Sequence, residues 1–370
     1  MIIKIEKDML IAPLKNLVGV AEKKQTMPIL GNVLFRAESG ALRLVASDLE
    51  VEISTQVDYQ TDESLNSTLP GKKLLDILKS LPGEGDVTID FNEDKATIKS
   101  GKSRFVLSSL PGSDFPYDKE EMDYKFNIPA NSLDGLINQT SFSMAFQDAR
   151  HFLNGMFFEV GAEKITVVAT DGHRLSMSAC RHGNPTNEPV NCIIPRKCIT
   201  EIKRILNEFK DNKEHLVDFN IKSNHFYFKV DGYFVKSKLI EGNYPDYNKV
   251  FPESLPHKLD VDKNELKSAL QRMSILSNEQ FKGVKLSLSS SEVKLSTNNP
   301  SQEEGEDSIS CNYSGDVLDI GFNLTYLIEV IDVISSKNIV LQLNNSDSGC
   351  LISSNDNDAL NKYIIMPMRV

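Results

Sequence analysis

The chain repeats one pattern of elements three times, and this repetition limits the folds that it can adopt. Each copy begins with an amphipathic helix, near residues 8, 131 and 264. A strand pair follows each helix, and we expect these pairs at residues 32–36 with 41–46, 155–159 with 164–169, and 283–287 with 292–296. A second helix then starts near residues 70, 195 and 323. The spacing is 125 residues from Pro70 to Pro195 and 123 residues from Ala46 to Ala169. Two nearly equal spacings in different elements indicate a true internal repeat.

These repeats predict an α+β fold, with helices on one face of antiparallel sheets. We expect three tandem domains at residues 1–122, 123–249 and 250–370. The acidic stretch 118–123 and the proline-containing stretch 245–256 are the expected linkers. A length of 370 residues agrees with two or three domains at roughly 150 residues each.

The C-terminal segment 364–370 is apolar where most chain ends are polar. Ile364 and Ile365 fit a last strand in a sheet. Pro367 cannot donate to a strand ladder, and the methionines on either side of it are flexible and polarizable. We therefore expect the end of the chain to form one wall of a binding groove.

The net charge of −11 argues against binding to nucleic acid when it is taken alone. Its distribution is uneven, however, because acidic residues gather in the stretches 118–123 and 303–307. Basic residues recur on the outer faces of the predicted helices, among them Lys72, Lys73, Arg196, Lys197, Lys203 and Arg204. Ordinary solvated helix faces would explain the same pattern, so it leaves both interpretations open.

Five scattered cysteines contain no Cys-x-x-Cys pair, which predicts reduced thiols in a cytoplasmic protein. The six histidines show no metal-ligand spacing, and we expect no metal or other cofactor. The N-terminus alternates apolar and charged residues, unlike a signal peptide. The sequence contains no run of 18 apolar residues, so we expect no membrane span.

Several short motifs occur in a fixed order along the chain. They are Thr26-Met27-Pro28-Ile29-Leu30-Gly31-Asn32, Phe152-Leu153-Asn154-Gly155-Met156, Ala169-Thr170-Asp171-Gly172-His173-Arg174-Leu175, Tyr244-Pro245-Asp246-Tyr247, Leu276-Ser277-Asn278-Glu279 and Met366-Pro367-Met368-Arg369. With these motifs the whole chain resembles the bacterial DNA polymerase III β subunits, the sliding clamps. The resemblance implies a non-catalytic, head-to-tail homodimer that closes into a ring around duplex DNA, with helices inside and sheets outside.

The resemblance also implies how the ring meets DNA and proteins. Positions that match DNA contacts are Lys24, Gln147, Arg150, His151 and Phe152. The implied protein partners are the DNA polymerase III catalytic subunit, the clamp loader, and other polymerases and repair proteins that carry clamp-binding peptides. His151 and Phe152 stand where the family has a tyrosine pair. Lys249 stands where the family has an arginine, and a lysine keeps the charge but lacks the planar guanidinium that can donate two parallel hydrogen bonds.

A peptide-binding groove is expected between the second and third repeats. Its matching positions are Leu153, Gly155, Thr170, Gly172, His173, Arg174, Leu175, Pro245, Lys249, Val250, Asn323, Tyr326, Met366, Pro367, Met368 and Arg369. An apolar floor with a few polar anchors suits an extended peptide.

The implied dimer contact joins the first repeat of one copy to the third repeat of the other. Phe105 and Leu107 would meet Ile275 and Leu276, and Lys72 and Lys73 would face Glu303 and Glu304. Ordinary core packing of Phe105 and Ile275 is the alternative.

Two other functions are compatible with the same residues. A repeat-built protein scaffold would use the groove without any role on DNA. A hydrolase would use Asp171 and His173 as acid and base, although no nucleophile motif accompanies them.

Overall fold

The computed structural model describes residues 1–21, 27–38, 40–83, 85–117, 123–184, 186, 188–209, 215–252, 255–355 and 360–369. The chain forms two compact units. Unit 1 comprises Met1–Asp134 and Lys197–Leu239, and unit 2 comprises Gly135–Arg196 and Ile240–Val370. The units therefore do not coincide with the three sequence repeats, since each unit gathers elements from two of them.

Unit 1 contains two antiparallel sheets. The smaller sheet has the order β1 (Ile2–Glu6), β6 (Asp86–Phe91), β7 (Lys95–Ser100) and β8 (Ser103–Ser108). The larger has the order β10 (Phe126–Pro129), β15 (Leu216–Lys222), β16 (His225–Val230), β17 (Tyr233–Lys238), β4 (Val51–Val57), β3 (Ala41–Ser47), β2 (Asn32–Glu38), β5 (Leu65–Pro70) and β9 (Leu110–Pro111). Strands of the first and second repeats thus share one sheet, which is joined where β17 pairs with β4.

Unit 2 has the same plan. Its larger sheet has the order β14 (Val190–Pro195), β11 (Gly155–Val160), β12 (Lys164–Thr170), β13 (Arg174–Arg181), β26 (Lys362–Ile365), β25 (Cys350–Ser354), β24 (Asn338–Leu343), β18 (His257–Asp262) and β22 (Asn312–Ser314). Its smaller sheet has the order β21 (Glu304–Ser310), β20 (Glu292–Asn298), β19 (Gly283–Leu288) and β23 (Leu318–Asn323). The second and third repeats meet where β13 pairs with β26.

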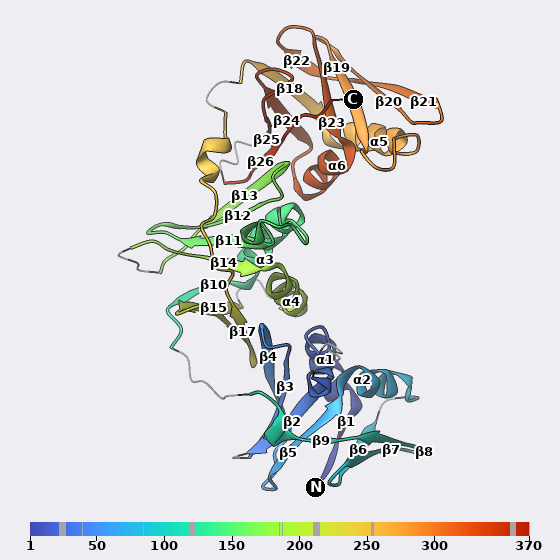
Figure 1. Ribbon diagram of the computed structural model, residues 1–370, viewed down its shortest axis with the longest axis vertical. Coiled ribbons are helices and arrows are strands. Elements are labelled where there is room, and N and C mark those ends of the chain that lie inside the picture. Colours follow the sequence, from blue (N-terminus) through green and yellow to red (C-terminus); the bar gives the residue numbers. More distant parts are fainter. Residues whose placement is uncertain are drawn as a thin grey trace. The chain divides into compact units, whose positions relative to one another are not determined.

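Six α-helices accompany the sheets of the described residues. They are α1 (Lys7–Leu17), α2 (Gly71–Ser80), α3 (Ala130–Thr140), α4 (Arg196–Leu206), α5 (Lys263–Ser274) and α6 (Leu324–Val333). Helix α1 packs against α2 and α5 packs against α6, as Figure 1 shows. Short 3-10 helices are η1 (Pro28–Gly31), η2 (Gly112–Asp114), η3 (Ser141–Ser143), η4 (His151–Leu153), η5 (Asn207–Phe209) and η6 (Tyr247–Val250).

The predicted helices and strand pairs are present, and two local reasons for their limits are visible. Asp262 caps α5, because its carboxylate accepts hydrogen bonds from the N–H groups of Asn264 and Glu265 at 2.8 and 3.1 Å. Helix α1 ends at Leu17, although an apolar stripe continues to Ala21. At Gly19 an added Cβ would lie 1.8 Å from an Arg204 nitrogen and 2.4 Å from a Glu201 oxygen, so glycine leaves room for these two side chains of α4.

Candidate functional site

A tight turn between β12 and β13 holds the Asp171-Gly172-His173 segment. Asp171 Oδ1 accepts hydrogen bonds from the N–H groups of His173 and Arg174 at 2.9 and 3.0 Å. Its Oδ2 accepts from Arg174 Nε at 3.0 Å. Gly172 has a φ of +88°, where a side chain would be strained. Both carboxylate oxygens of Asp171 are therefore used to shape the turn.

Arg174 connects this turn to α6 and to the residues after α3. Its side chain is 8% exposed and pairs with Asp171 and with Glu329. It also donates to the Phe142 carbonyl, and its guanidinium lies 4.3 Å from the ring centroid of Tyr326. A planar cation that makes four such contacts fixes the shape of the surrounding surface.

The C-terminal strand confirms the prediction for Ile364 and Ile365. Strand β26 is inserted between β13 and β25, and both isoleucines are buried. Beyond the strand, Met366 N donates to the His173 carbonyl at 2.8 Å and Met368 N donates to the Gly321 carbonyl at 2.9 Å. Met366 remains 40% exposed. The tail is thus fixed by its backbone, while a methionine side chain faces outward.

An apolar floor lies beside the tail. Val168, Leu175 and Ile364 form a buried cluster, against which the partly buried Phe157 and Tyr244 pack. The rings of Phe157 and Tyr244 stack with centroids 5.0 Å apart. Burial raises the pKa of Tyr244 well above its ordinary value, so its hydroxyl stays protonated.

Other predicted groove positions differ in their exposure and in their contacts. Leu153 is buried, whereas Val250 is 39% exposed. Lys249 Nζ lies 3.4 Å from Asp246 Oδ2, and both side chains are largely exposed. Asn323 caps α6, because its side chain accepts from the N–H groups of Thr325 and Tyr326.

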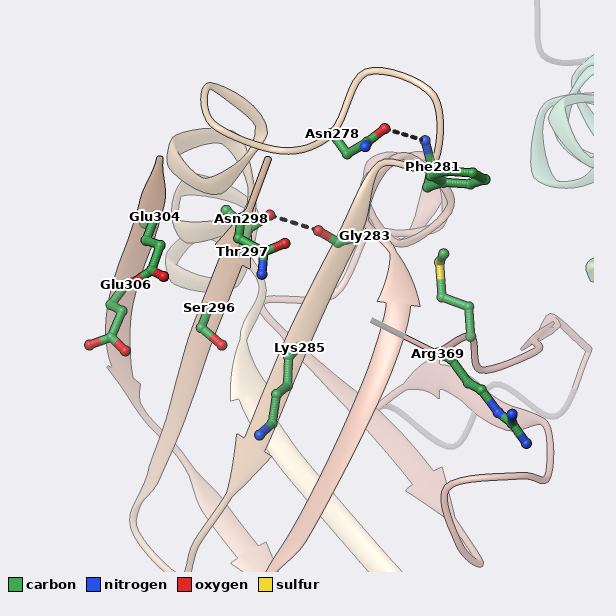
Figure 2. A pocket seen from close by; sticks show the side chains of 12 residues that line it. Asn278, Phe281, Gly283, Lys285, Ser296, Thr297, Asn298, Glu304, Glu306 and Arg369 are labelled. Carbon is green, nitrogen blue, oxygen red and sulfur yellow. Dashed lines mark hydrogen bonds between the residues drawn. The ribbon is translucent and has the colours of Figure 1, made fainter. Parts of the chain in front are cut away.

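A hollow of about 470 Å³ lies next to the tail in unit 2. Figure 2 shows Glu304 and Glu306 along one side, Phe281 and Arg369 along the other, and Lys285 between them. Sequence reasoning had placed Met368 and Arg369 in a groove but had missed Phe281, which is 56% exposed. The two acidic side chains and the nearby cations make this hollow more polar than the floor under Met366.

The loop before η4 and η4 itself contain four of the residues predicted to touch DNA. Gln147 has a φ of +56°, and Gln147, Arg150 and His151 are exposed, while Phe152 is half-buried. Sequence reasoning missed Phe146, which is 72% exposed and lies 5.7 Å from the guanidinium of Arg196. An exposed aromatic ring among basic side chains is typical of a surface on which bases stack.

The other basic residues predicted to contact DNA differ in whether an acidic side chain of this chain already pairs with them. Lys72 and Lys73 are exposed on α2. Lys197 Nζ lies 2.7 Å from the buried carboxylate of Asp48, and Arg204 pairs with the buried Glu201 at 2.5 Å. The Lys197–Asp48 pair joins α4 to the turn before β4, whereas the Arg204–Glu201 pair lies within α4. Lys203 is half-buried, and Lys24 lies outside the described residues.

The predicted dimer residues lie at or near edge strands. Strand β8 ends the small sheet of unit 1, with Phe105 half-buried and Val106 44% exposed. Leu107 points into the core and is 9% exposed, so Val106 is the more available side chain. Strand β21 ends the small sheet of unit 2, and Ile275 after α5 is 78% exposed.

Three family models match consecutive parts of the chain. They describe the N-terminal, central and C-terminal domains of the DNA polymerase III beta subunit, at residues 1–119, 127–246 and 248–369. The chain belongs to this family.

Full-length relatives and solved structures agree with this assignment. The beta sliding clamps of Pseudomonas aeruginosa and Escherichia coli K12 are 39% and 36% identical over 368 residues, which is 99% of each chain. Two solved sliding clamps bound to griselimycin are also similar over 100% of both chains. The Pseudomonas aeruginosa structure has 39% identity and a TM-score of 0.92, and the Bartonella birtlesii structure has 32% and 0.94.

The hydrolase alternative would use Asp171 and His173 as acid and base. The Asp171 carboxylate accepts hydrogen bonds from two backbone N–H groups and from Arg174, so both of its oxygens have partners within this part of the chain. Among the described residues, no group of three or more histidine, cysteine, aspartate or glutamate side chains could hold a metal ion. In the same part of the chain, no helix is long and apolar enough to cross a membrane.

Proposed function

We propose that two copies of this chain close into a ring around duplex DNA, slide along it, and hold replication proteins on it without catalysing a reaction. The chain would be organised as clamp domains at residues 1–122, 123–249 and 250–370, and the ranges of the family models support these limits. Free cysteines at the five positions are in keeping with a cytoplasmic protein.

The observation that carries this proposal is a sheet junction that occurs twice within the chain. Strand β4 of the first repeat pairs with β17 of the second, and β13 of the second pairs with β26 of the third. By position in the repeat, the next pair would be β21 of the third repeat with β8 of the first. Both of these are edge strands of four-stranded sheets. Pairing them between two copies would complete the series and cover two exposed edges.

Charges on the two edge strands favour this pairing. Exposed Lys102 and Arg104 lie at β8, whereas exposed Glu304 and Glu306 lie on β21. Rim pairs of this kind contribute little affinity each but favour the correct register. Apolar contact with the exposed Ile275 would supply more of the stabilisation.

A closed ring explains retention on DNA without tight binding. Twelve helices of ~10 Å width, set side by side, would form a circle with a circumference of about 120 Å. The hole inside that circle would have a diameter of roughly 28 Å. Basic side chains such as Lys72 and Arg150 would attract phosphates without reading the sequence, so sliding is not obstructed.

The groove beside the tail would bind extended peptides of partner proteins. We assign this role to the floor of Leu175 and Tyr244, the wall formed by Met366, and the turn at residues 170–174. The expected partners are the DNA polymerase III catalytic subunit, the clamp loader, and other polymerases and repair proteins. The two similar clamps bound to griselimycin support the presence of a ligand site in the family.

Electron microscopy of the purified protein tests the ring directly. Class averages should show a closed ring with an open hole and pseudo-six-fold symmetry. Compact particles without a hole, at a concentration where dimers persist, would refute the encircling mechanism and favour the scaffold alternative.

A double variant tests the junction. Ile275→Ala with Leu276→Lys should sediment as a monomer, because it removes apolar contact and places a cation at the edge. Val317→Lys is the matched control, since Val317 is 83% exposed in unit 2 and has no part in the proposed junction. An intact dimer of the double variant would exclude this interface.

A further inference from the structure

The turn at residues 47–51 in unit 1 is built like the turn at 170–174 in unit 2. Asp48 Oδ1 accepts from the backbone N–H groups two and three residues later, at 2.9 and 2.7 Å. Asp171 Oδ1 makes the same two bonds at 2.9 and 3.0 Å. The hydroxyl of the first turn residue also accepts from the N–H two residues on, at 3.2 Å for Ser47 and 3.1 Å for Thr170.

The strand that passes this turn is also placed alike in the two units. Lys238 N donates to the Glu50 carbonyl at 2.8 Å, as Met366 N donates to the His173 carbonyl at 2.8 Å. Lys238 therefore occupies the position at which the tail of the chain presents Met366. The backbone arrangement of the proposed peptide groove, a turn and the strand end that passes it, thus occurs a second time in unit 1 with different side chains.

A hollow of about 400 Å³ opens at this second frame. Its apolar lining consists of Leu49, Val51, Phe115, Pro116 and Tyr117. Its charged and ionisable lining consists of Glu50, Glu52, His225, Lys236 and Lys238. Phe115 and Pro116 correspond in the repeat to Tyr244 and Pro245 of the first groove. The hollow therefore combines an aromatic and aliphatic floor with charges of both signs, among which Lys238 is an exposed cation. All of these residues belong to unit 1.

Leu49 provides a second, independent observation. Its φ is +77°, in the left-handed region that disfavours a bulky side chain, whereas the corresponding residue in the other turn is Gly172. The Leu49 side chain is nevertheless 43% exposed, so burial within the chain does not compensate for the strain. Strained residues persist chiefly where a local geometry is used, and here the strained residue carries an exposed apolar group at the mouth of the hollow.

We infer that this hollow is a second peptide-docking site, which binds an extended segment of a partner protein that carries an aliphatic side chain next to an acidic residue. The aliphatic side chain would pack on Leu49 and Phe115. The acidic residue would face Lys238, because the lysine stands where the first groove offers Met366. The class of ligand rests on the proposed function of the first groove, whereas the site itself rests on the geometry of unit 1.

The test uses a displayed library of random heptapeptides, panned against the full chain carrying Met366→Asp, which disables the first groove. Selected peptides are synthesised with a fluorophore, and their affinity is measured by anisotropy. We expect enrichment of an aliphatic residue beside an acidic one, and at least tenfold weaker binding to Leu49→Asp and to Lys238→Glu. A peptide with the acidic residue changed to lysine should regain affinity for Lys238→Glu.

Two further variants separate docking from folding. Leu49→Gly relieves the strained φ, so it should raise the melting temperature and still weaken peptide binding. Leu216→Asp changes another leucine of unit 1 that is 55% exposed and should leave binding unchanged. The inference is overturned if no peptide is enriched, or if binding ignores both Leu49→Asp and Lys238→Glu. Because this assay requires neither a ring nor DNA, its failure is distinguishable from failure of the clamp function.

Discussion

Replacing Arg174 by alanine should destabilise unit 2 far more than a surface charge change does. The guanidinium is 8% exposed and pairs with Asp171, whose side chain is 17% exposed. Removing one partner of a buried ion pair costs about 3–5 kcal/mol, because the other charge is left uncompensated. Glu329 is 39% exposed, so the loss of that pair adds only about 0–1 kcal/mol. Stacking on Tyr326 is a similar small contribution, about 0.5–2 kcal/mol.

These contributions overlap, and we expect a loss of about 4 kcal/mol in the free energy of unfolding. For a folding unit of this size, each kcal/mol lowers the melting temperature by about 2–4 °C, so a fall of roughly 10 °C is expected in scanning calorimetry. Arg174→Lys should recover little, because an ammonium cannot bridge two carboxylates and stack on a ring.

The matched control is Lys267→Ala, which removes a pair with Asp332 whose side chains are 35% and 46% exposed. It should lower the melting temperature by no more than about 3 °C. A shift for Arg174→Ala as small as that of the control would refute the view that this arginine organises the groove.

Three other substitutions test separate parts of the structure. Phe146→Ala should lower the affinity for single-stranded DNA about tenfold at constant salt, because it removes the ring on which a base can stack. Arg150→Gln should instead reduce the salt dependence of DNA binding, lowering its slope by about one. Burial alone would raise the pKa of Asp48, but hydrogen bonds from Lys197 and from backbone N–H groups outweigh it, and the pKa is lowered. The stabilisation is therefore complete above the unfolded pKa of about 4 and is lost as pH falls through the folded pKa. Asp48→Asn should thus lose more stability at pH 7 than at low pH in urea unfolding, and an equal loss at both would contradict the lowered pKa.

Much of the fold could be predicted because its signals are local. The strand pair expected at 283–287 and 292–296 appears as β19 and β20, each within two residues of the expected limits. The cap at Asp262 is equally local, because its carboxylate accepts from N–H groups two and three residues later. Periodicity and capping depend on neighbours in sequence, so a single repeat contains enough information to place its elements.

The pairing of strands between repeats could not be predicted in the same way. Nothing in β4 or β17 alone indicates that they pair, because any alternating strand can accept another at its edge. The candidate site shows the same limit. Arg174 was chosen by resemblance, but its contact with Glu329 joins residues far apart in sequence and depends on how β13 meets α6.

The two sheet junctions within the chain and the third one that we propose between copies differ in their turns. At the junction of β13 and β26 the turn contains Gly172, and the chain end supplies methionines. At the junction of β4 and β17 the turn contains Leu49, and the strand continues through a lysine.

At the third junction the turn between β20 and β21 is longer, and Asn299 accepts from the N–H groups of Ser301 and Glu303 at 3.0 and 3.1 Å. A neutral amide thus organises this turn, as a carboxylate organises the other two, next to a strand rich in acidic residues. An additional carboxylate there would repel Glu303 and Glu304, so asparagine preserves the turn without adding charge. Divergence at this turn is what we expect if the third junction is reserved for a second copy of the chain rather than for a peptide.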